Sequence, residues 1–279
     1  MHGRVLVCAG SDCSGGAGAQ ADIKTITALG GYAMTAITAL TAQNTLGVFD
    51  IHEVPPAFIA RQMSLCLEDI GADVIKTGML ATAAVIETIG AVLDARAPAL
   101  PLVVDPVMVA KGGAALLTPQ ALKALGASLL SRATLITPNL PEAETLLGGN
   151  VSLDTLKATE TAARRLLELT PEGPRAVLLK GGHRRGETVM DILATRSGTV
   201  TVFSHPRIES PHTHGTGCTL AAAIACGLAQ GMTLETAIVR ARVYVHTAIA
   251  TAPAFGHGHG PLNHAHTVRE DVSRMARPE

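Results

Sequence analysis

The sequence predicts an α/β fold in which helices cover both faces of a mostly parallel sheet, with an antiparallel hairpin at one edge. Short apolar runs at 5–9 (VLVCA), 102–105 (LVVD) and 176–180 (AVLLK) are typical of strands buried on both faces. Stretches with helical spacing separate these runs, as parallel strands require. Hydrophobic residues make up 47% of the chain and aromatic residues 2%, so we expect closely packed layers around an aliphatic core.

The first quarter of the chain begins with a strand and a glycine-rich loop. We expect a strand at 5–9, a loop at 10–18, a helix at 19–29, and strands at 32–40 and 48–54. Pro55 and Pro56 then open a helix that continues to Ile70, because proline in the first turn of a helix loses no hydrogen bond.

Beyond residue 72, strands and helices alternate regularly. Predicted strands lie at 73–76, 102–105, 135–137 and 176–180, and predicted helices lie at 81–93, 119–130, from 141, and at 153–169. The runs 189–194 and 199–204, joined through Ser197 and Gly198, form the predicted edge hairpin. Two Ala-rich helices follow at 219–230 and 234–250. We find no repeat and no long linker, so we predict a single domain over 1–279 with a polar, fraying tail at 269–279.

Charge and hydropathy exclude several classes of protein. The formal net charge is -1 and the pI is about 6.8, without a block of like charge, so we expect no nucleic-acid partner. The longest apolar stretch, near 219–228, is too short to span a bilayer, and the first residues do not match a signal peptide. The five cysteines lack CxxC spacing, which disfavours a disulfide framework or a zinc ribbon. We therefore predict a cytoplasmic protein without a membrane partner.

The carboxyl ends of the predicted strands locate a binding site. In open α/β sheets, ligands bind outside these ends. The loops after Ala9, Lys76, Asp105, Thr137 and Lys180 are therefore expected to line one crevice.

The segment 214–218 (HGTGC) carries the strongest local signal. Gly215 and Gly217 let the backbone turn tightly into a helix and direct several N–H groups to one point, which suits the charge of a phosphoryl group in transfer. Cys218 lies in the first turn, where we expect a lowered thiol pKa and a thiolate able to take the proton of a substrate hydroxyl. The alternative is a glycine-rich helix cap with Cys218 as a small buried filler.

A second glycine-rich turn, 15–18 (GGAG), follows a strand and opens a helix. This context is typical of a ligand-binding turn, although the GK[ST] ending of a phosphate loop is missing. The turn is also explained by glycine packing alone. Asp22, in the helix that follows, is either a site residue or an acid that favours the helix dipole.

Other polar residues lie at strand ends. Asp105 and Glu142 beside a phosphate site suit Mg²⁺, which takes one or two carboxylates with phosphate and water oxygens. The alternatives are a turn former at Asp105 and a first-turn helix residue at Glu142. Lys180 can reach a nucleotide phosphate, or can be a solvated strand end. Gln43 offers a donor and an acceptor to the edge of a heterocycle, or belongs to a turn.

Four histidines gather in 255–266 (FGHGHGPLNHAH). The HxH spacing suggests a metal tract, but no acidic residue or cysteine accompanies it. A glycine-rich flap over the crevice is the better interpretation.

Taken together, these segments resemble one family. The motifs GSDCSGGAGAQADIKT, ITALTAQNT, KTGML, VVDPVM, TPNLPEAE, VLLKGGH and THGTGCTLAAAIA are similar, in order from Val5 to His264, to those of hydroxymethylpyrimidine and phosphomethylpyrimidine kinases in the ribokinase-like superfamily. The resemblance implies a single three-layer α/β/α domain of ribokinase-like fold. It also implies that ATP phosphorylates 4-amino-5-hydroxymethyl-2-methylpyrimidine to its monophosphate and then to its diphosphate, in thiamine biosynthesis. A homodimer is common in this superfamily.

Motif matches assign roles to residues of this chain. The anion hole is formed by Gly215, Thr216, Gly217 and Cys218, with Cys218 as the candidate base. Gln43 matches the position that binds the pyrimidine amino group, and the rest of the substrate pocket matches Gly10, Ala17, Asp22, Met79 and Val107. The ATP side matches Asn139 and Lys180, and the Mg²⁺ side matches Asp105 and Glu142.

The chain departs from the family pattern at two places. His257 stands where the family often has Lys, so a phosphate contact there is in question, and Ser210-Pro211-His212-Thr213 stands where Asn often precedes the Thr. A pyridoxal kinase is the alternative enzyme, because it shares the Cys-type anion hole. A non-catalytic metabolite-binding module on the same fold is the alternative from another class.

Overall fold

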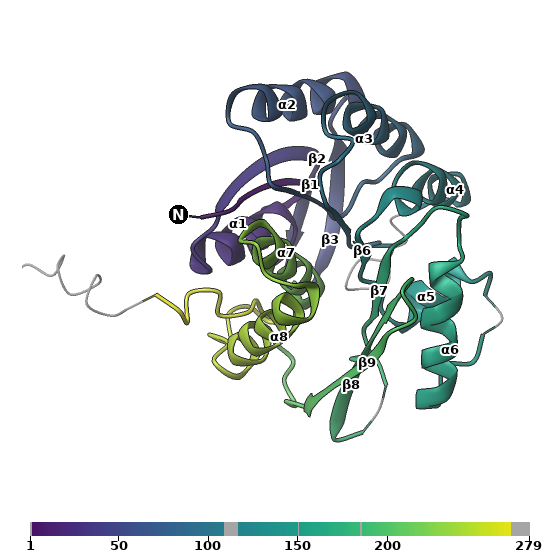
Figure 1. Cartoon of the computed structure of the whole chain (residues 1–279). Coiled ribbons are helices and arrows are strands. Elements are labelled where there is room, and N and C mark those ends of the chain that lie inside the picture. The colour runs from purple at the N-terminus through teal and green to yellow at the C-terminus, as the bar shows by residue number, and fades with distance from the viewer. Residues whose placement is uncertain (1, 109–116, 150, 185, 269–279) are drawn as a thin grey trace, which may run out of the picture.

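A nine-stranded sheet forms the centre of the molecule in the computed structural model, which describes residues 2–108, 117–149, 151–184 and 186–268. The strands lie in the order β3-β2-β1-β4-β5-β6-β7-β8-β9 (Figure 1). Their bounds are β1 Arg4–Asp12, β2 Tyr32–Asn44, β3 Gly47–Glu53, β4 Val74–Thr77, β5 Leu102–Val104, β6 Leu135–Ile136, β7 Ala176–Leu179, β8 Thr188–Thr195 and β9 Val200–Pro206.

The six central strands, β2, β1, β4, β5, β6 and β7, are parallel to one another, as predicted. At one edge β7, β8 and β9 pair antiparallel, so the predicted edge hairpin is confirmed. At the other edge β3 pairs antiparallel with β2, and this pairing continues along β2 as far as Asn44. Gln43 therefore lies inside a strand rather than after one, because pairing with β3 extends β2 beyond its predicted end at residue 40.

Helices cover both faces of the sheet, which confirms the three-layer α/β/α prediction. One face is covered by α2 (Pro56–Asp69), α3 (Ala83–Arg96), α4 (Pro119–Ser128), α5 (Leu140–Leu146) and α6 (Leu156–Leu167). The other is covered by α1 (Gly18–Ala28), α7 (Thr216–Ala229) and α8 (Leu234–Ala250), and a short 3-10 turn, η1, spans Leu130–Arg132.

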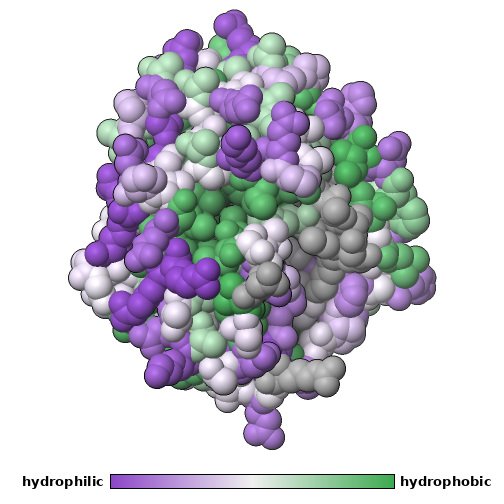
Figure 2. Space-filling view, turned by 90° about the vertical axis from the view of Figure 1, so that its right-hand side faces the viewer, coloured by the Kyte–Doolittle hydropathy of each residue, from purple (hydrophilic) through white to green (hydrophobic). Residues whose placement is uncertain are grey.

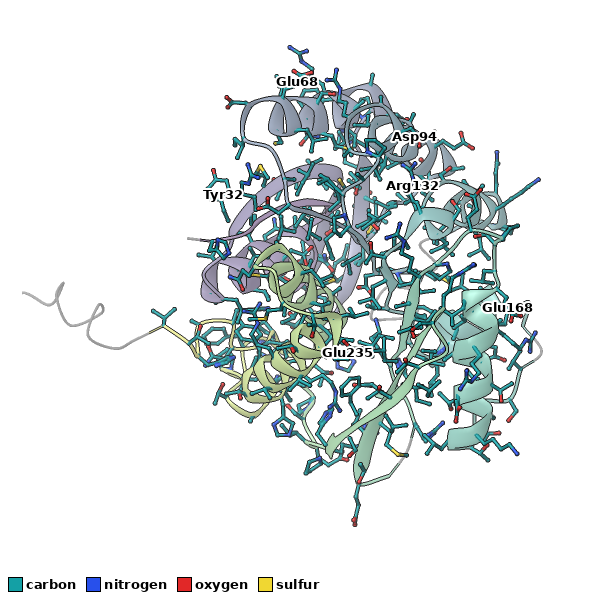
Figure 3. The ribbon with its side chains drawn as sticks, in the orientation of Figure 1. Tyr32, Glu68, Asp94, Arg132, Glu168 and Glu235 are labelled. Atoms are coloured by element: carbon teal, nitrogen blue, oxygen red, sulfur yellow. The ribbon has the colours of Figure 1, made fainter. Side chains whose placement is uncertain are left out.

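Strand periodicity decides which core each side chain enters. In β1, Leu6 and Cys8 pack on the α2–α6 side, whereas Val5, Val7 and Ala9 pack on the α1–α7–α8 side. Charged side chains such as Glu68, Glu168 and Glu235 stay exposed on the outside of the helical layers (Figure 3). Small residues in α7 let it lie close to the sheet and to α8, so this central helix is almost completely buried.

The surface is polar around a hollow. Figure 2 shows apolar side chains gathered at the centre of one face, with hydrophilic side chains around them. In the described part of the chain, no helix combines the length and the apolar character that a bilayer crossing needs. The predicted polar tail at 269–279 lies outside the described residues.

Candidate active site

A cavity of about 730 Å³ opens at the carboxyl ends of the parallel strands. Its wall includes residues that follow β1, β4, β5, β6 and β7, so the predicted crevice is confirmed. The sequence-predicted site residues that it brings together are Gly10, Ala17, Gln43, Met79, Asp105, Val107, Asn139, Glu142, Lys180, Gly215, Thr216, Gly217 and Cys218.

The N-terminus of α7 faces this cavity. The helix begins at Thr216, three residues earlier than predicted, because Gly215 adopts a left-handed conformation with φ 82° and serves as the cap. A side chain at Gly215 would collide with the backbone oxygen of Gly16. Thr216 Oγ1 donates to Thr213 O at 2.8 Å, which ties the turn together. Thr216 N also donates to Thr213 O at 3.4 Å. Because the cap has no side chain, the N–H groups of Gly217 and Cys218 are not taken by a side-chain cap and can meet an incoming anion.

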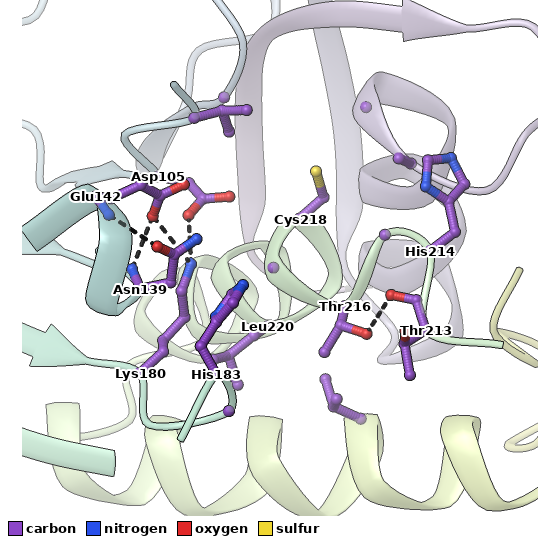
Figure 4. A pocket seen from close by; sticks show the side chains of 18 of the residues that line it. Asp105, Asn139, Glu142, Lys180, His183, Thr213, His214, Thr216, Cys218 and Leu220 are labelled. Carbon is purple, nitrogen blue, oxygen red and sulfur yellow. Dashed lines mark hydrogen bonds and ion pairs between the residues drawn. The ribbon is translucent and has the colours of Figure 1, made fainter. Parts of the chain in front are cut away.

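Cys218 occupies the first turn of α7 and lines the cavity, half-buried. Figure 4 shows its sulfur between the Asp105–Glu142–Lys180 group on one side and His214 on the other. The predicted lowering of its pKa is wrong: burial raises the pKa of the Cys218 thiol to about 11. Lys76 and the backbone N–H of Gly18 act in the opposite direction, but they do not outweigh the lost solvation of a thiolate.

Asp22 does not line the cavity, contrary to the prediction that it contacts substrate. Its side chain is fully buried and forms a 2.7 Å ion pair with Lys76 Nζ, which is also fully buried. The backbone of α1 turns Asp22 inward toward β4, so the residue serves the interior of the protein. Burial raises the pKa of Asp22 to about 6, although Lys76 opposes this shift.

A lysine stands between the two carboxylates at the ends of β5 and β6. Lys180 Nζ lies 2.9 Å from Asp105 Oδ1 and 3.9 Å from Glu142 Oε2. Burial alone would raise the pKa of Asp105, but Lys180 and Lys76 hold it below its ordinary value. Burial raises the pKa of Glu142 to about 7, against the attraction of Lys180.

Local structure places Glu142 in this group. Asn139 caps α5 and accepts from Glu142 N at 2.9 Å, while Glu142 Oε2 accepts from Asn139 N at 2.7 Å. Glu142 is therefore the first-turn helix residue of the alternative interpretation and a cavity residue at the same time.

The carboxylates fit a magnesium ion. Among the described residues, no three possible ligands gather as a closed metal cage. Asp105 and Glu142 nonetheless share the cavity wall with the N-terminus of α7, and Mg²⁺ needs one or two carboxylates when phosphate oxygens complete its shell.

Several other residues of the cavity wall suit a flat ring as a ligand. Gln43 Nε2 donates to Thr41 Oγ1 at 2.7 Å, which leaves the amide oxygen to accept from a ligand. Gly10 lies against the Met79 side chain, since a Cβ added at Gly10 would be 3.2 Å from its sulfur. Apolar Met79 and Val107 and the polar Gln43 edge thus line the same cavity.

Sequence reasoning missed a side-chain pair, Asp12 and His214, beside the N-terminus of α7. Asp12 accepts from Ser14 N, Gly16 N and Ala17 N at 2.8, 3.1 and 2.7 Å, and its Oδ2 lies 2.9 Å from His214 Nε2. The pair joins the loop after β1 to the turn before α7. An aspartate in a glycine-rich loop is a signal for such backbone hydrogen bonds, but its distant partner cannot be read from a single sequence.

A second missed group of side chains lines the cavity next to the loop after β7. Arg242 Nε donates to Asp191 Oδ2 at 2.9 Å, and Asp191 Oδ1 accepts from Gly181 N at 2.9 Å. Arg242 also contacts His205, whose ring packs edge-on against His246 with 5.3 Å between centroids. These side chains fasten α8 and β9 to the loop after Lys180, so they shape the cavity there.

The histidine-rich segment does not match the flap interpretation. Within the described range 186–268, residues 255–266 contribute nothing to the cavity wall. His259 N donates to Thr45 O at 2.8 Å, and the N–H groups of His257 and Gly258 donate to Thr45 Oγ1 at 3.2 Å. The segment therefore packs on the turn between β2 and β3.

Comparisons with known proteins agree with this geometry. The family model described as phosphomethylpyrimidine kinase matches residues 12–263. The chain is 52% identical over 271 residues to the thiamine biosynthesis bifunctional protein ThiED of Geobacter sulfurreducens, covering 97% of this chain and 54% of that protein. It is 44% identical over 264 residues to a hydroxymethylpyrimidine/phosphomethylpyrimidine kinase of Haemophilus influenzae, covering 94% of this chain and 96% of that one.

Among solved structures, the pyridoxal kinase of Staphylococcus aureus in complex with ADP superposes with a TM-score of 0.86 at 34% identity, covering 96% of both chains. The family model and the H. influenzae relative each extend over most of the chain, and the matched range 12–263 includes the cavity residues from Asp12 to Ile249. The chain belongs to the hydroxymethylpyrimidine/phosphomethylpyrimidine kinase family of ribokinase-like proteins.

Proposed function

We propose that this chain transfers a phosphoryl group from ATP to 4-amino-5-hydroxymethyl-2-methylpyrimidine, and then a second one to the resulting monophosphate, in thiamine biosynthesis. One observation carries the proposal: the N-terminus of α7, which has no side-chain cap, opens into the same cavity as Lys180, Asp105 and Glu142. Phosphoryl transfer depends on positioning and on charge stabilisation rather than on covalent chemistry. Backbone N–H groups and a lysine at one point supply that stabilisation.

The substrate ring lies, in this proposal, in the part of the cavity lined by Gln43, Met79 and Val107. Gln43 Oε1 accepts from the exocyclic amino group, while Met79 and Val107 pack on the ring. Ala17 has only a methyl side chain and Gly10 has none, which leaves room for the ring at this part of the cavity. The hydroxymethyl group then points toward α7.

ATP enters from the side of Lys180 and Asn139, so its phosphates meet the N-terminus of α7. Asp105 and Glu142 would hold Mg²⁺, which neutralises charge on the phosphates when it is bound. Lys180 stands between the two carboxylates and supplies a fixed positive charge beside the migrating group. The nucleoside extends toward the Arg242–Asp191 group at the far end.

Cys218 is the proposed base for the substrate hydroxyl. It can take a proton only as a thiolate, and a pKa of about 11 leaves roughly one thiolate in ten thousand at pH 7. Lys76 and the Gly18 N–H are the groups that favour that form. Forming the thiolate therefore costs free energy, and Lys76 and the Gly18 N–H reduce that cost.

A pyridoxal kinase is the second candidate, because the S. aureus pyridoxal kinase superposes over 96% of this chain. A non-catalytic binding module is less well supported, since binding alone does not require Cys218, Lys180 and two carboxylates around a helix N-terminus. An ADP-coupled assay with ATP and Mg²⁺, run with the hydroxymethyl pyrimidine and with pyridoxal, compares kcat/KM for the two alcohols. We expect the pyrimidine to have the higher value. A higher value for pyridoxal favours the second candidate, and no ADP from either favours the module.

Three further expectations stay predictions. A single kinase domain over 1–279 is supported by the one continuous sheet. A cytoplasmic location is supported by five cysteines that are all free. A homodimer is supported by the exposed apolar side chains of Phe49, in the edge strand β3, and of Leu46, just before it.

A further inference from the structure

The fully buried ion pair of Asp22 and Lys76 has no part in the substrate contacts proposed above. Lys76 lies in the middle of a parallel strand, β4, and its side chain is 0% exposed. A buried charge is costly, and a buried pair is often no more stable than apolar residues of the same size. A functional role would explain why the chain keeps this costly pair, and the nearby Cys218 is the group on which it could act.

Helix α1 brings this pair close to the sulfur. Helix α7 packs against β4, which carries Lys76, and Gly18, the first residue of α1, lines the cavity together with Cys218. Asp22 is four residues later, so it lies one helical turn further along the same face of α1, and that helix packs against α7. Lys76 Nζ is 2.7 Å from Asp22 Oδ2 and also reaches the cavity wall.

Other charges around the sulfur come from the neighbouring strands. Asp105 follows β5 and Lys180 follows β7, and both act on Cys218 electrostatically. Lys180 is already paired with Asp105 at 2.9 Å. The Asp22–Lys76 pair is thus a second ion pair acting on the sulfur, and it is more deeply buried than the Lys180–Asp105 pair.

We propose that Lys76 and Asp22 are positioning residues that act through Cys218: together they set how readily its sulfur carries a negative charge. This inference rests on the proposed function in giving Cys218 the role of base. Lys76 stabilises a charged sulfur, and Asp22 both holds the lysine in place and limits that stabilisation. Burial alone would lower the pKa of Lys76, but Asp22 and Cys218 raise it, so the lysine is charged throughout the physiological range.

The test measures the sulfur directly, without substrate, nucleotide or metal. Alkylation of Cys218 by neutral iodoacetamide is followed by peptide mass spectrometry between pH 7 and 11, with C218S as the blank. D22N removes a negative charge, so we expect its profile to move to lower pH. K76M removes the positive charge, so its profile is expected to move to higher pH, each by about one pH unit.

The opposite directions expected for the D22N and K76M profiles distinguish an electrostatic role from a structural one. Loosening of the core would expose the thiol and move both profiles in the same direction. Asp69→Asn and Lys123→Met, at exposed positions on α2 and α4, are the matched controls. If either single variant fails to fold, the double variant D22N/K76M removes the pair as a whole. Lys76 has a larger effect on the pKa of the Cys218 thiol than Asp22 has. The alkylation profile of the double variant is therefore expected to move to higher pH.

Shifts of D22N and K76M in the same direction, or no shift in any folded variant, would overturn the proposal. The kinase assay is a separate arm: in K76M we expect kcat to fall with little change in the KM of the alcohol. If the wild-type protein shows no kinase activity but the alkylation profiles move as expected, the proposed function fails while the charge pair stands.

Discussion

His214 Nε2 lies 2.9 Å from Asp12 Oδ2, and this contact joins the two glycine-rich turns of the active site across 202 positions of sequence. Asp12 ends β1 at the start of the glycine-rich loop, and His214 immediately precedes Gly215, the cap of α7. Gly16 packs directly on the His214 ring, and the backbone of Gly215 packs on Gly16. The relative position of the two turns therefore depends on this pair.

Asp12→Asn is expected to lower stability near neutral pH by about 1–3 kcal/mol, because one amide oxygen cannot accept every bond of the carboxylate. Burial alone would raise the pKa of Asp12, but bonds from His214 and Ser14 hold it below its ordinary value. The stability that this depressed pKa contributes is fully present above the unfolded pKa and is lost as pH falls through the folded pKa. Urea unfolding from pH 7 down to pH 3 measures it. The prediction is contradicted if the difference in unfolding free energy between wild type and Asp12→Asn grows as the pH falls to 3.

Gln43→Leu is expected to raise the KM of the hydroxymethyl pyrimidine by roughly 10-fold or more, because the ring then loses a hydrogen-bond acceptor in a buried site. The KM of ATP should stay near the wild-type value. Steady-state kinetics with each substrate varied in turn gives both constants. Thr35→Val, at a partly buried position earlier in β2, is the control for disturbing this strand. An unchanged pyrimidine KM in Gln43→Leu removes Gln43 from the substrate site.

Lys180→Met is expected to lower kcat/KM for ATP by about 100-fold or more, because both the charge beside the phosphates and the partner of two buried carboxylates disappear. Asp105 and Glu142 are then left near each other without a cation. Isothermal titration with a nonhydrolysable ATP analogue, with and without Mg²⁺, separates nucleotide binding from chemistry. Binding equal to wild type under both conditions would exclude the nucleotide role of Lys180.

Cys218→Ala is expected to lower turnover by about 10²-fold while the pyrimidine still binds, because a proton acceptor is lost but the N–H groups of α7 remain. Cys218→Ser tests the chemistry further, since a hydroxyl keeps the size of the side chain but forms an anion less readily than a thiol. Rates of both variants across pH 7 to 10 complete the comparison. An unchanged rate in Cys218→Ala rejects the base role and leaves the kinase itself in place.

The parallel core could be predicted from sequence because its strands are continuous apolar runs. The strand at 176–180 and the hairpin after it are examples: β7 spans Ala176–Leu179 and β8 and β9 form the edge. The start of α7 was missed by three residues because Gly215, Thr216 and Gly217 have low helix propensity, although a left-handed cap allows them to open a helix.

The members of the candidate site could be predicted where they belong to a motif, but their partners could not. Lys76 ends an apolar run and has the sequence pattern of a strand end, yet it is fully buried because α1 carries Asp22 to the same depth. The motif match predicts a substrate contact for Asp22, but α1 turns this side chain inward to Lys76. The thiol of Cys218 shows the same limit, since the position in a first turn predicts a low pKa and burial reverses it.

The central claim is two successive phosphoryl transfers at one helix N-terminus. Phosphorus NMR of a reaction containing limiting hydroxymethyl pyrimidine, excess ATP and Mg²⁺ follows the products directly. We predict a transient phosphomonoester signal that gives way to a diphosphate, with two ADP formed for each pyrimidine consumed. Unchanged pyrimidine in the presence of folded protein, ATP and Mg²⁺ would contradict the account.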